Sequence, residues 1–488
     1  MTSALWEATA ELVHRRTGLV FPEGRRRTLE DGVARIMRRN RIGDPQALVR
    51  QLESQAALLD ELVSEITVGE TYFFRHPEQI AVIRNRILPA LLRETRDRPL
   101  RMWSAGCATG EEPYTLAILA WEMGITDRVR ILGTDLSRHA LRVARRGRYR
   151  PWSLRGTPAE IRNRHFTEEN GTLTLSPAIR DLVDLRYLNL AEDVYPALST
   201  QVWGMDLVLC RNVLIYFDAE TGGEVAGRLL ESLSEPGWLV VGASDPLLSQ
   251  WAPAAVVQTD AGLAYRRPAT APTPPSPPGA TPPPPPTTFV ATSEVSSRAS
   301  PGPPGSPPRE SVEIPSPPAF PPSLGEKARA RYAARDYREA ADLAQEALSA
   351  TSHDAELWVL LVRSLANLGR MRDAARFCTA AAEHHSTDPE LAYLEAVLFA
   401  NLDRPVDSVR AARRALYLDR GFVMAHLTLG SALSRLGDRG GARRSFRNAQ
   451  AILGELPPQA GPPASDGEPA GRLLLLAKTQ LELLEDEP

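Results

Sequence analysis

The sequence predicts an α/β protein in which a doubly wound, Rossmann-like sheet lies between two helical regions. In residues 1–85 apolar side chains recur at helical spacing, as Leu58, Leu62 and Ile66 illustrate. Between residues 98 and 268, short β-rich runs alternate with helical runs, a pattern typical of βαβ units in a parallel sheet. The C-terminal region repeats every 34 positions, which indicates an all-α domain of stacked helical pairs.

The composition is that of a soluble protein with several domains. The chain has 488 residues, more than one hydrophobic core usually organises, so two or three domains are expected. Its net charge of −3 gives no overall field to attract nucleic acid or a membrane surface. The three cysteines, Cys107, Cys210 and Cys378, are far apart, which disfavours a disulfide framework or a metal site. No apolar run of about 18 residues occurs, so we expect a cytoplasmic protein without direct membrane insertion.

Shifts in composition divide the chain into five parts. In order, we expect a helical domain (1–85), the sheet domain (86–268), a disordered Pro-rich linker (269–322), a repeat domain (323–456) and a tail with a capping helix (457–488). Inside the sheet domain, Asn170-Gly171 is a two-residue hairpin signal between two short strand-like runs. A small antiparallel β-subdomain is therefore expected at about 150–188.

The 34-residue period is carried by small residues at fixed places. One such series is Ala340, Ala374, Ser408 and Ala442, and a second is Ala347, Ala381, Ala415 and Ala449. A further series, Arg335, Gly369, Asp403 and Gly437, keeps the same spacing. The pattern resembles the tetratricopeptide repeat, in which small residues let paired helices pack closely. Stacked repeats of this kind form a concave groove, which we expect to bind a segment of an unidentified partner protein. An Ala-rich bundle without a groove is the alternative.

A ligand-binding loop is predicted within LRMWSAGCATGEEPY, residues 100–114. The segment reads as a strand, a small-residue loop and a helix, and Gly106 and Gly110 allow the backbone to approach a ligand closely. The spacing is not that of the dinucleotide motif G-x-G-x-x-G. Two carboxylates, Glu111 and Glu112, stand at the helix N-terminus, where they would repel a pyrophosphate and attract a cation such as S-adenosylmethionine.

The next strand supplies another acidic position. It ends in Gly133-Thr134-Asp135, which places the Asp135 carboxylate where a ribose diol would lie in a nucleotide-binding βαβ fold. For each glutamate alone, capping of the helix dipole is an equally good explanation. The combination of strand, glycine loop, paired glutamates and strand-terminal Asp135 favours S-adenosylmethionine as the cofactor, with no metal.

Residues 1–265 resemble the CheR family of chemoreceptor methyltransferases. The motifs that carry the resemblance follow the family's order: TVGETYFFRHPEQ (67–79), SAGCATGEEPYTLA (104–117), GTDLSRHAL (133–141), LNL (188–190) and CRNVLIYF (210–217). The resemblance implies a protein-glutamate O-methyltransferase that acts in chemotaxis-like signal transduction. It also implies the residues that surround the cofactor: Gly69, Thr71, Arg75, Glu112, Asp135, Asn189, Leu190, Arg211 and Asn212.

Two residues are candidates for a direct role in catalysis. A glutamate side chain has a pKa near 4.3, so it is already a nucleophilic carboxylate at pH 7 and needs no general base. Our hypothesis is that Arg75 and Tyr216 orient this carboxylate or close over the cofactor, and the resemblance favours Tyr216 as the substrate-positioning phenol. For Tyr216, a purely structural place in the core is the alternative.

A basic segment suggests where the substrate docks. Residues 15–41 are rich in arginine, and Arg27, Arg35, Arg38 and Arg39 can share one broad helical face. By the resemblance, this face would dock on the acidic methylation helices of a chemoreceptor's cytoplasmic signalling domain. A generic solvated face is the alternative, and no nucleic-acid-binding motif accompanies the segment. In relatives the β-subdomain can bind a receptor tail by strand addition, a question that stays open for this sequence.

Two other functions compete with this interpretation. The same cofactor fold can methylate a small molecule or a nucleic acid, although the basic helical domain and the motifs argue against that reading. Alternatively, the sheet domain is an inert scaffold and the repeats carry the function. The presence of Arg75, Glu112, Asp135 and Asn212 argues against an inert domain.

Overall fold

The structure is a computed structural model, and some segments of the chain lie outside its description. It describes residues 3–67, 70–96, 98–197, 200–268, 323–334, 336–350, 354–402 and 404–485. The predicted linker, 269–322, lies outside the described residues, as do Gly69 and the repeat positions Arg335 and Asp403. Within the described residues, no helix is both long enough and apolar enough to cross a bilayer.

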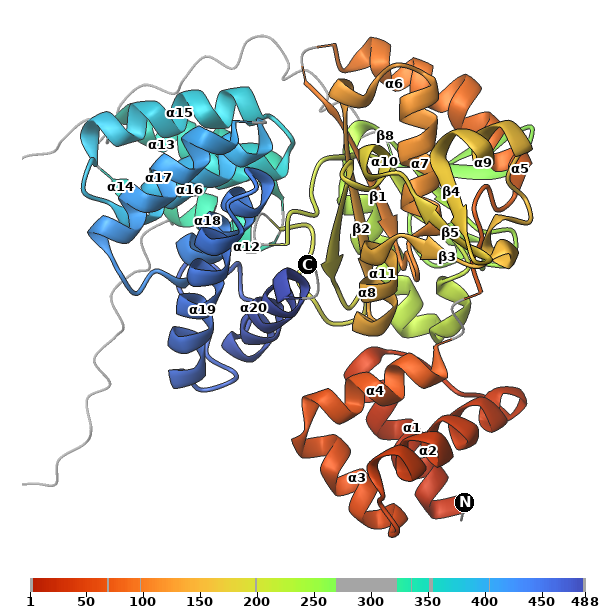
Figure 1. The fold of residues 1–488 in the computed structure, drawn as a ribbon. Helices are drawn as coiled ribbons and strands as arrows, with labels where there is room; N and C mark the ends of the chain where they lie inside the picture. Colours follow the sequence, from red (N-terminus) through yellow and green to blue (C-terminus); the bar gives the residue numbers. More distant parts are fainter. Residues whose placement is uncertain are drawn as a thin grey trace, which may run out of the picture. The chain divides into compact units, whose positions relative to one another are not determined.

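The N-terminal domain is a cluster of four α-helices and a short 3-10 turn (Figure 1). They are α1 (Ser3–Thr17), η1 (Glu23–Arg25), α2 (Arg26–Asn40), α3 (Pro45–Ser54) and α4 (Ala56–Ile66). Helices α2 and α4 approach closely at Gly32, where an added Cβ would lie 2.5 Å from the Ile66 side chain. Because a larger residue cannot fit there, this glycine fixes the contact between the two helices.

The central domain is built on a seven-stranded sheet in the order β6-β2-β1-β7-β8-β10-β9. Its strands are β1 (Leu100–Ala105), β2 (Val129–Asp135), β6 (Val183–Tyr187), β7 (Met205–Cys210), β8 (Leu233–Val241), β9 (Ala255–Thr259) and β10 (Gly262–Arg266). The first five strands of this order are parallel, which confirms the predicted doubly wound sheet. At one edge of the sheet, β10 pairs antiparallel with both β8 and β9. The two-residue turn between β9 and β10 is too short for the crossover that a parallel pair would need.

Helices cover both faces of this sheet. Along β1, Trp103 and Ala105 face one core, whereas Leu100 and Met102 face the other, as expected for the two-residue period of a strand. The first core also receives α11 (Ala219–Glu231) and the N-terminal helical domain. The second core contains α5 (Pro77–Val82), the π-helical turn η2 (Ile83–Ile87), α6 (Leu88–Glu94), α7 (Glu111–Glu122) and α8 (Arg138–Arg146).

The predicted antiparallel insertion is present. Three short strands, β3 (Arg148–Tyr149), β4 (Phe166–Glu169) and β5 (Thr172–Leu175), form a sheet in the order β3-β5-β4. Between β4 and β5, Asn170 and Gly171 have φ angles of 51° and 71°, the left-handed values that a type I′ hairpin turn requires. Short helical segments flank these strands: η4 (Pro151–Leu154), α9 (Ala159–His165) and α10 (Pro177–Arg180).

The C-terminal region consists of stacked helical pairs (Figure 1), as the repeat predicts. The helices are α12 (Leu324–Ala333), α13 (Tyr337–Ala350), α14 (Ala355–Asn367), α15 (Met371–His384), α16 (Pro389–Asn401), α17 (Pro405–Leu418), α18 (Val423–Arg435), α19 (Arg439–Glu455) and α20 (Ala470–Glu485). The small residues of the repeat lie where helices cross. At Gly430, for example, an added Cβ would meet the Phe446 ring at 2.7 Å.

A buried ion pair ties the start of β7 to the start of β1. The Asp206 carboxylate is fully buried and accepts two hydrogen bonds of 2.6 Å from the Arg98 guanidinium. The same carboxylate accepts the backbone N–H of Arg101 at 2.9 Å and the Ser234 hydroxyl at 2.6 Å. Because water does not reach the Asp206 carboxylate, these four donors satisfy it in place of water.

We expect Asp206→Ala to lower the free energy of unfolding by about 3–5 kcal/mol, since it leaves the Arg98 charge without its partner. Urea denaturation followed by tryptophan fluorescence measures the change. The control is Asp181→Ala, which removes an exposed carboxylate 3.6 Å from Arg180 and should cost less than about 1 kcal/mol. Equal losses in the two variants would contradict this account of Asp206.

Candidate active site

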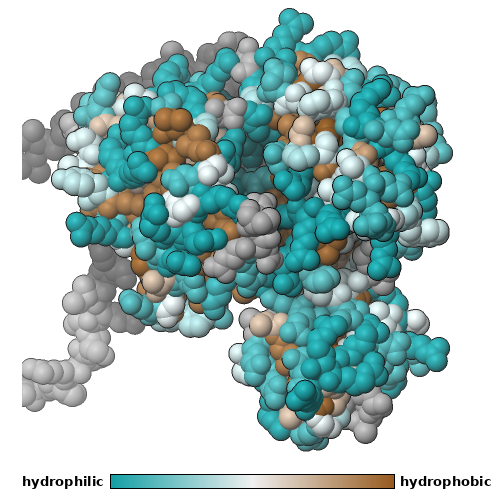
Figure 2. Space-filling view, in the orientation of Figure 1, coloured by the Kyte–Doolittle hydropathy of each residue, from teal (hydrophilic) through white to brown (hydrophobic). Residues whose placement is uncertain are grey.

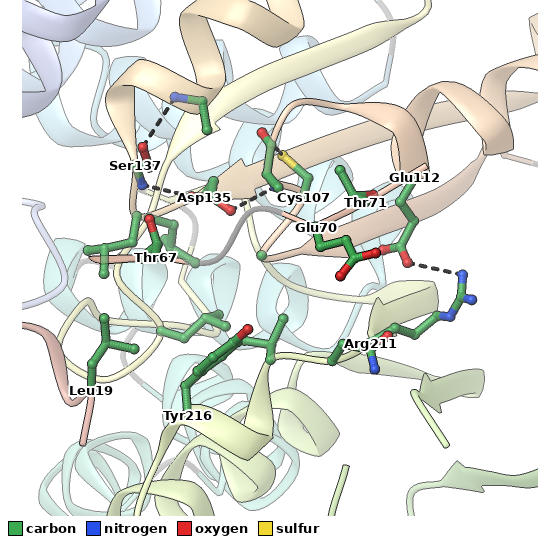
Figure 3. Close-up of a pocket in the computed structure, with 18 of the residues that line it drawn as sticks. Leu19, Thr67, Glu70, Thr71, Cys107, Glu112, Asp135, Ser137, Arg211 and Tyr216 are labelled. Carbon is green, nitrogen blue, oxygen red and sulfur yellow. Dashed lines mark hydrogen bonds and ion pairs between the residues drawn. The ribbon is translucent and has the colours of Figure 1, made fainter. Parts of the chain in front are cut away.

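A large cavity opens at the carboxyl ends of β1, β2 and β7. From β1 the chain continues to β2 on one side and later returns to β7 on the other, so the strand order reverses between β1 and β7. Open α/β sheets bind ligands at such a switch point. The cavity has a volume of about 1170 Å³ including its open mouth, and Figure 3 shows side chains from several segments converging on it.

The floor of the cavity depends on a glycine after β1. Gly106 has φ of +76°, and a Cβ added there would lie 2.5 Å from Val213 in the loop after β7. The backbone N–H groups of Gly106 and Cys107 both donate to the Thr134 carbonyl oxygen, each at 2.8 Å. The loops after β1 and β7 therefore touch directly, which only a residue without a side chain permits.

The Asp135 carboxylate lies at the end of β2 and organises the loop after β1. One oxygen accepts the backbone N–H of Ala108 at 2.8 Å, and the other accepts the backbone N–H of Ser137 at 2.7 Å (Figure 3). Burial raises the pKa of Asp135, while these backbone donors oppose the rise. Each oxygen keeps a further lone pair, so the carboxylate can still accept hydroxyl groups from a ligand.

The two glutamates at the start of α7 have different surroundings. Glu112 lines the cavity, accepts the Ser104 hydroxyl at 2.7 Å and pairs with Arg211 at 3.2 Å (Figure 3). Burial raises its pKa, and the Arg211 charge opposes the rise. Glu111 is also buried, but it accepts the Thr109 hydroxyl at 2.6 Å and is not among the lining residues. Of the two glutamates, Glu112 is therefore the one on the cavity wall, where Asp135 and Glu70 are further acidic residues.

An unsatisfied acceptor lies in the loop after β7. Asn212 lines the cavity with φ of +60°, and its Oδ1 is buried without a hydrogen-bond partner among the described residues. This backbone conformation is held by Asp245, which accepts the N–H groups of Asn212 at 2.6 Å and of Gly242 at 2.7 Å. A buried acceptor without a partner is costly, and a ligand N–H group in the cavity would relieve it.

Cationic and aromatic groups also line the cavity. The Tyr216 ring lies under the Arg25 guanidinium, with 4.2 Å between the guanidinium carbon and the ring centroid. Arg75 donates to the Glu70 carbonyl oxygen at 2.6 Å, and its own carbonyl oxygen accepts from Arg211. Burial raises the pKa of Tyr216, with Arg25 opposing the rise, so the phenol stays protonated near neutral pH.

Most of the predicted cofactor and catalytic residues meet at this cavity. Those that line it are Thr71, Arg75, Gly106, Glu112, Asp135, Asn189, Leu190, Arg211, Asn212 and Tyr216. Gly110 does not line it, because at φ +92° it begins α7 and packs against Ala144 and Tyr114. Sequence reasoning missed Leu19, Phe21 and Arg25, which reach the cavity from the helical domain. Arg25 lies in the basic segment, but its position on Tyr216 has no local sequence signal.

The predicted docking arginines differ in their contacts. Arg35 and Arg39 both pair with Glu65 of α4, at 2.6 and 2.8 Å. Arg27 and Arg38 are exposed on α2, and Figure 2 shows that the visible face of the helical domain is mostly hydrophilic. Part of the positive charge on α2 is therefore neutralised by Glu65, and Arg27 and Arg38 add exposed positive charge outside these two pairs.

The cavity fits S-adenosylmethionine by the chemistry of its wall. Glu112 and Asp135 supply negative charge for a cationic ligand, and the unsatisfied Asn212 Oδ1 can accept from an amino group. Leu136, Leu188 and Leu190 provide apolar surface beside Asp135 for an adenine ring. No cluster of His, Cys, Asp or Glu suited to a metal ion occurs in the part of the chain that the structure describes.

We expect Glu112→Gln to weaken binding of S-adenosylmethionine about tenfold or more, because it removes negative charge from a buried wall that faces a cation. Isothermal titration calorimetry measures the affinity. The matched control is Glu111→Gln, which changes the neighbouring buried carboxylate outside the cavity and should alter the affinity less than about threefold. If both variants lose affinity equally, the cavity wall is not the source of the attraction.

Comparison with known protein families supports an S-adenosylmethionine site in the sheet domain. Residues 69–262 match the family described as CheR methyltransferase, SAM binding domain, and residues 4–67 match its all-alpha domain. Residues 331–398 match the tetratricopeptide repeat.

Individual relatives extend over different parts of the chain. Chemotaxis protein methyltransferase 1 of Pseudomonas aeruginosa is 32% identical over 273 residues, 54% of this chain and 98% of the relative. A chemotaxis protein methyltransferase of Listeria monocytogenes is 36% identical over 200 residues, 41% of this chain and 74% of the relative. The probable biofilm formation methyltransferase WspC of Pseudomonas aeruginosa is 26% identical over 439 residues, 90% of this chain and 96% of the relative. Because chemotaxis protein methyltransferase 1 is 32% identical and is matched over 98% of its length, the chain belongs to the CheR methyltransferase family, whose methyl donor is S-adenosylmethionine.

Proposed function

We propose that the protein transfers a methyl group to glutamate side chains on the cytoplasmic signalling domain of a chemoreceptor. The observation that carries the proposal is that one cavity is lined by both acidic and basic side chains. Glu112 and Asp135 suit a cationic methyl donor, whereas Arg25, Arg75 and Tyr216 suit an anionic acceptor. A carboxylate substrate needs this combination, because the two reactants carry opposite charges and must lie side by side.

The residues of this chain act mainly by positioning. When bound, S-adenosylmethionine supplies an electrophilic methyl group on a positively charged sulfur. The substrate carboxylate is ionised at neutral pH, so no protein group has to remove a proton. Arg25 and Arg75 attract the carboxylate, and the protonated Tyr216 phenol donates a hydrogen bond that fixes its direction of approach. Such positioning can contribute about 7–11 kcal/mol to the lowering of the barrier.

The helical domain and the repeats serve recognition in this proposal. The exposed Arg27 and Arg38 of α2 would contact acidic helices of the receptor, and the repeats would bind a segment of another protein. The names of the relatives support a place in chemotaxis or a related surface response, since they include chemotaxis methyltransferases and a probable biofilm formation methyltransferase. A receptor substrate of this kind puts the reaction in the cytoplasm.

The proposal predicts a base-labile product. Incubation with radiolabelled S-adenosylmethionine and purified receptor signalling domains should transfer label that mild alkali releases as methanol, because carboxyl methyl esters hydrolyse readily in base. Mass spectrometry of the treated and untreated receptor then locates the modified glutamates. Label that survives alkali, or that appears only on nucleic acid or a small molecule, would support a different methyl acceptor.

Arg75→Ala and Tyr216→Phe should each lower kcat/KM for methyl transfer, by about 10- to 100-fold, because each removes a group that orients the carboxylate. Initial rates with the receptor domain measure the effect, and calorimetry shows whether S-adenosylmethionine still binds. Tyr417→Phe is the control, since it removes a phenol from a residue that is 86% exposed on the repeats. Full activity in both site variants would exclude this role for the two residues.

Charge reversal on α2 tests receptor docking. Arg27→Glu with Arg38→Glu should raise KM for the receptor domain at least tenfold and leave the affinity for S-adenosylmethionine unchanged, since neither residue lines the cavity. These two positions are preferable to Arg35 and Arg39, whose reversal would also disrupt the pairing with Glu65.

The matched control carries the same change in net charge on another element. Arg84→Glu with Arg86→Glu reverses two exposed arginines of η2, outside the helical domain. If this control weakens methylation as much as the α2 variant does, then overall charge, and not the α2 face, determines docking.

A further inference from the structure

The repeats present a continuous wall of first helices. Helices α12, α14, α16 and α18 contact one another in succession, and this inner row of a helical-repeat stack forms its concave face. Arg363 of α14 lies in the wall, and only 11% of its side chain is exposed. A buried guanidinium in a binding wall requires anionic partners, because its charge has lost most of its hydration.

The chain's own return loop, residues 456–469 between α19 and α20, supplies one of these partners. Asp466 of this loop accepts a hydrogen bond of 2.7 Å from the Arg363 guanidinium, and only 12% of its side chain is exposed. Tyr332 of α12 and Tyr393 of α16 lie near the pair: burial first, and then the Asp466 charge, raises the pKa of both phenols. The loop therefore places a carboxylate against three successive inner helices.

Arg363 stays positively charged, and one of its N–H donors has no hydrogen-bond partner among the described residues. Its other terminal nitrogen pairs with Glu390 of α16 at 2.8 Å. Burial alone would lower its pKa, but the Asp466 and Glu390 charges outweigh burial and keep the pKa above its usual range. The Nε–H group is buried and has no partner among the described residues. A ligand carboxylate could engage the fork more completely than Asp466 does.

The backbone of the return loop is strained at two residues near Arg363. Ala464 and Asp466 adopt φ angles of 60° and 55°, which residues with a side chain rarely adopt. The ends of the loop are closed by hydrogen bonds from the Ala470 N–H to the Ala460 carbonyl oxygen and from the Gly471 N–H to the Pro458 carbonyl oxygen. The Asp466 ion pair in the groove and the hydrogen bond from the Val194 N–H to the Glu468 carboxylate are among the contacts that offset this strain.

The groove continues beyond the return loop. A cavity of about 630 Å³, including its open mouth, lies beside Arg363 and extends toward α12. Its wall combines apolar surface at Val359 and Leu360 with the charged groups of Arg329 and Glu356. A peptide that engages Arg363 has room to run along this cavity, which the return loop does not line.

We propose that Arg363 is the carboxylate anchor of a peptide-binding groove and that the return loop occupies this anchor as an internal ligand. The displacing ligand is an extended, acidic segment of a partner protein, with an Asp or Glu flanked by small residues as in Pro463-Ala-Ser-Asp-Gly467. The proposal identifies the ligand chemistry of the repeats and does not depend on the methyl acceptor, since binding in the groove requires neither S-adenosylmethionine nor receptor.

The test uses the full-length protein and fluorescein-labelled peptides with the sequence of residues 461–469, GPPASDGEP. Fluorescence anisotropy should show at least tenfold tighter binding to Asp466→Ala than to the unmodified protein, because the variant frees the anchor. Glu455→Ala, which removes an exposed carboxylate near the end of α19, should bind like the unmodified protein. Adding Arg363→Gln to Asp466→Ala should abolish the gain.

A second peptide keeps the test informative if the Arg363 variant folds poorly. The same peptide with Asp466→Asn should bind the Asp466→Ala protein at least tenfold more weakly than the acidic peptide, since an amide cannot replace the carboxylate. Circular dichroism confirms that the variant proteins are folded. Equal affinity for the acidic and amide peptides, or no difference between Asp466→Ala and Glu455→Ala, would overturn the proposal.

Discussion

The active site depends on the close approach of two loops that follow β1 and β7. Gly106 lies so near Val213 that no side chain fits between them, and the Asp245 carboxylate fixes the second loop through its backbone N–H groups. Because the strand order reverses at this point, the two loops diverge above the contact and leave a cavity. The acidic wall and the unsatisfied Asn212 acceptor are both consequences of this geometry.

The helical domain adds positive charge to a cavity whose other walls belong to the sheet domain. The sheet domain alone supplies the acidic residues, whereas Arg25 arrives from the turn before α2 and stacks on Tyr216. A guanidinium on an aromatic face keeps its orientation with little additional entropy loss on binding. The same domain carries exposed arginines on α2, so the positive charge at the cavity and the positive charge on the domain surface lie in neighbouring segments.

Features with a local signature could be predicted from the sequence, and features created by tertiary contacts could not. The strand ending at Asp135, the Asn170-Gly171 hairpin and the 34-residue repeat each follow from spacing or turn chemistry within a short window. Which of Glu111 and Glu112 lines the cavity has no local signature, because adjacent helix positions point about 100° apart and only packing decides which one faces it. Arg25 and Asp245 reach the site from segments far away in the chain, which no local pattern reveals.

The shared walls of the cavity have a thermodynamic consequence. Leu19, Phe21 and Arg25 of the helical domain face Asp135 and Tyr216 of the sheet domain across one space. A molecule held there contacts both domains, so its binding free energy also opposes their separation. By mass action this contribution reaches about 2.7 kcal/mol when the ligand is present at 100 times its dissociation constant. A methyl donor bound in this space would therefore help to hold the helical domain against the sheet domain.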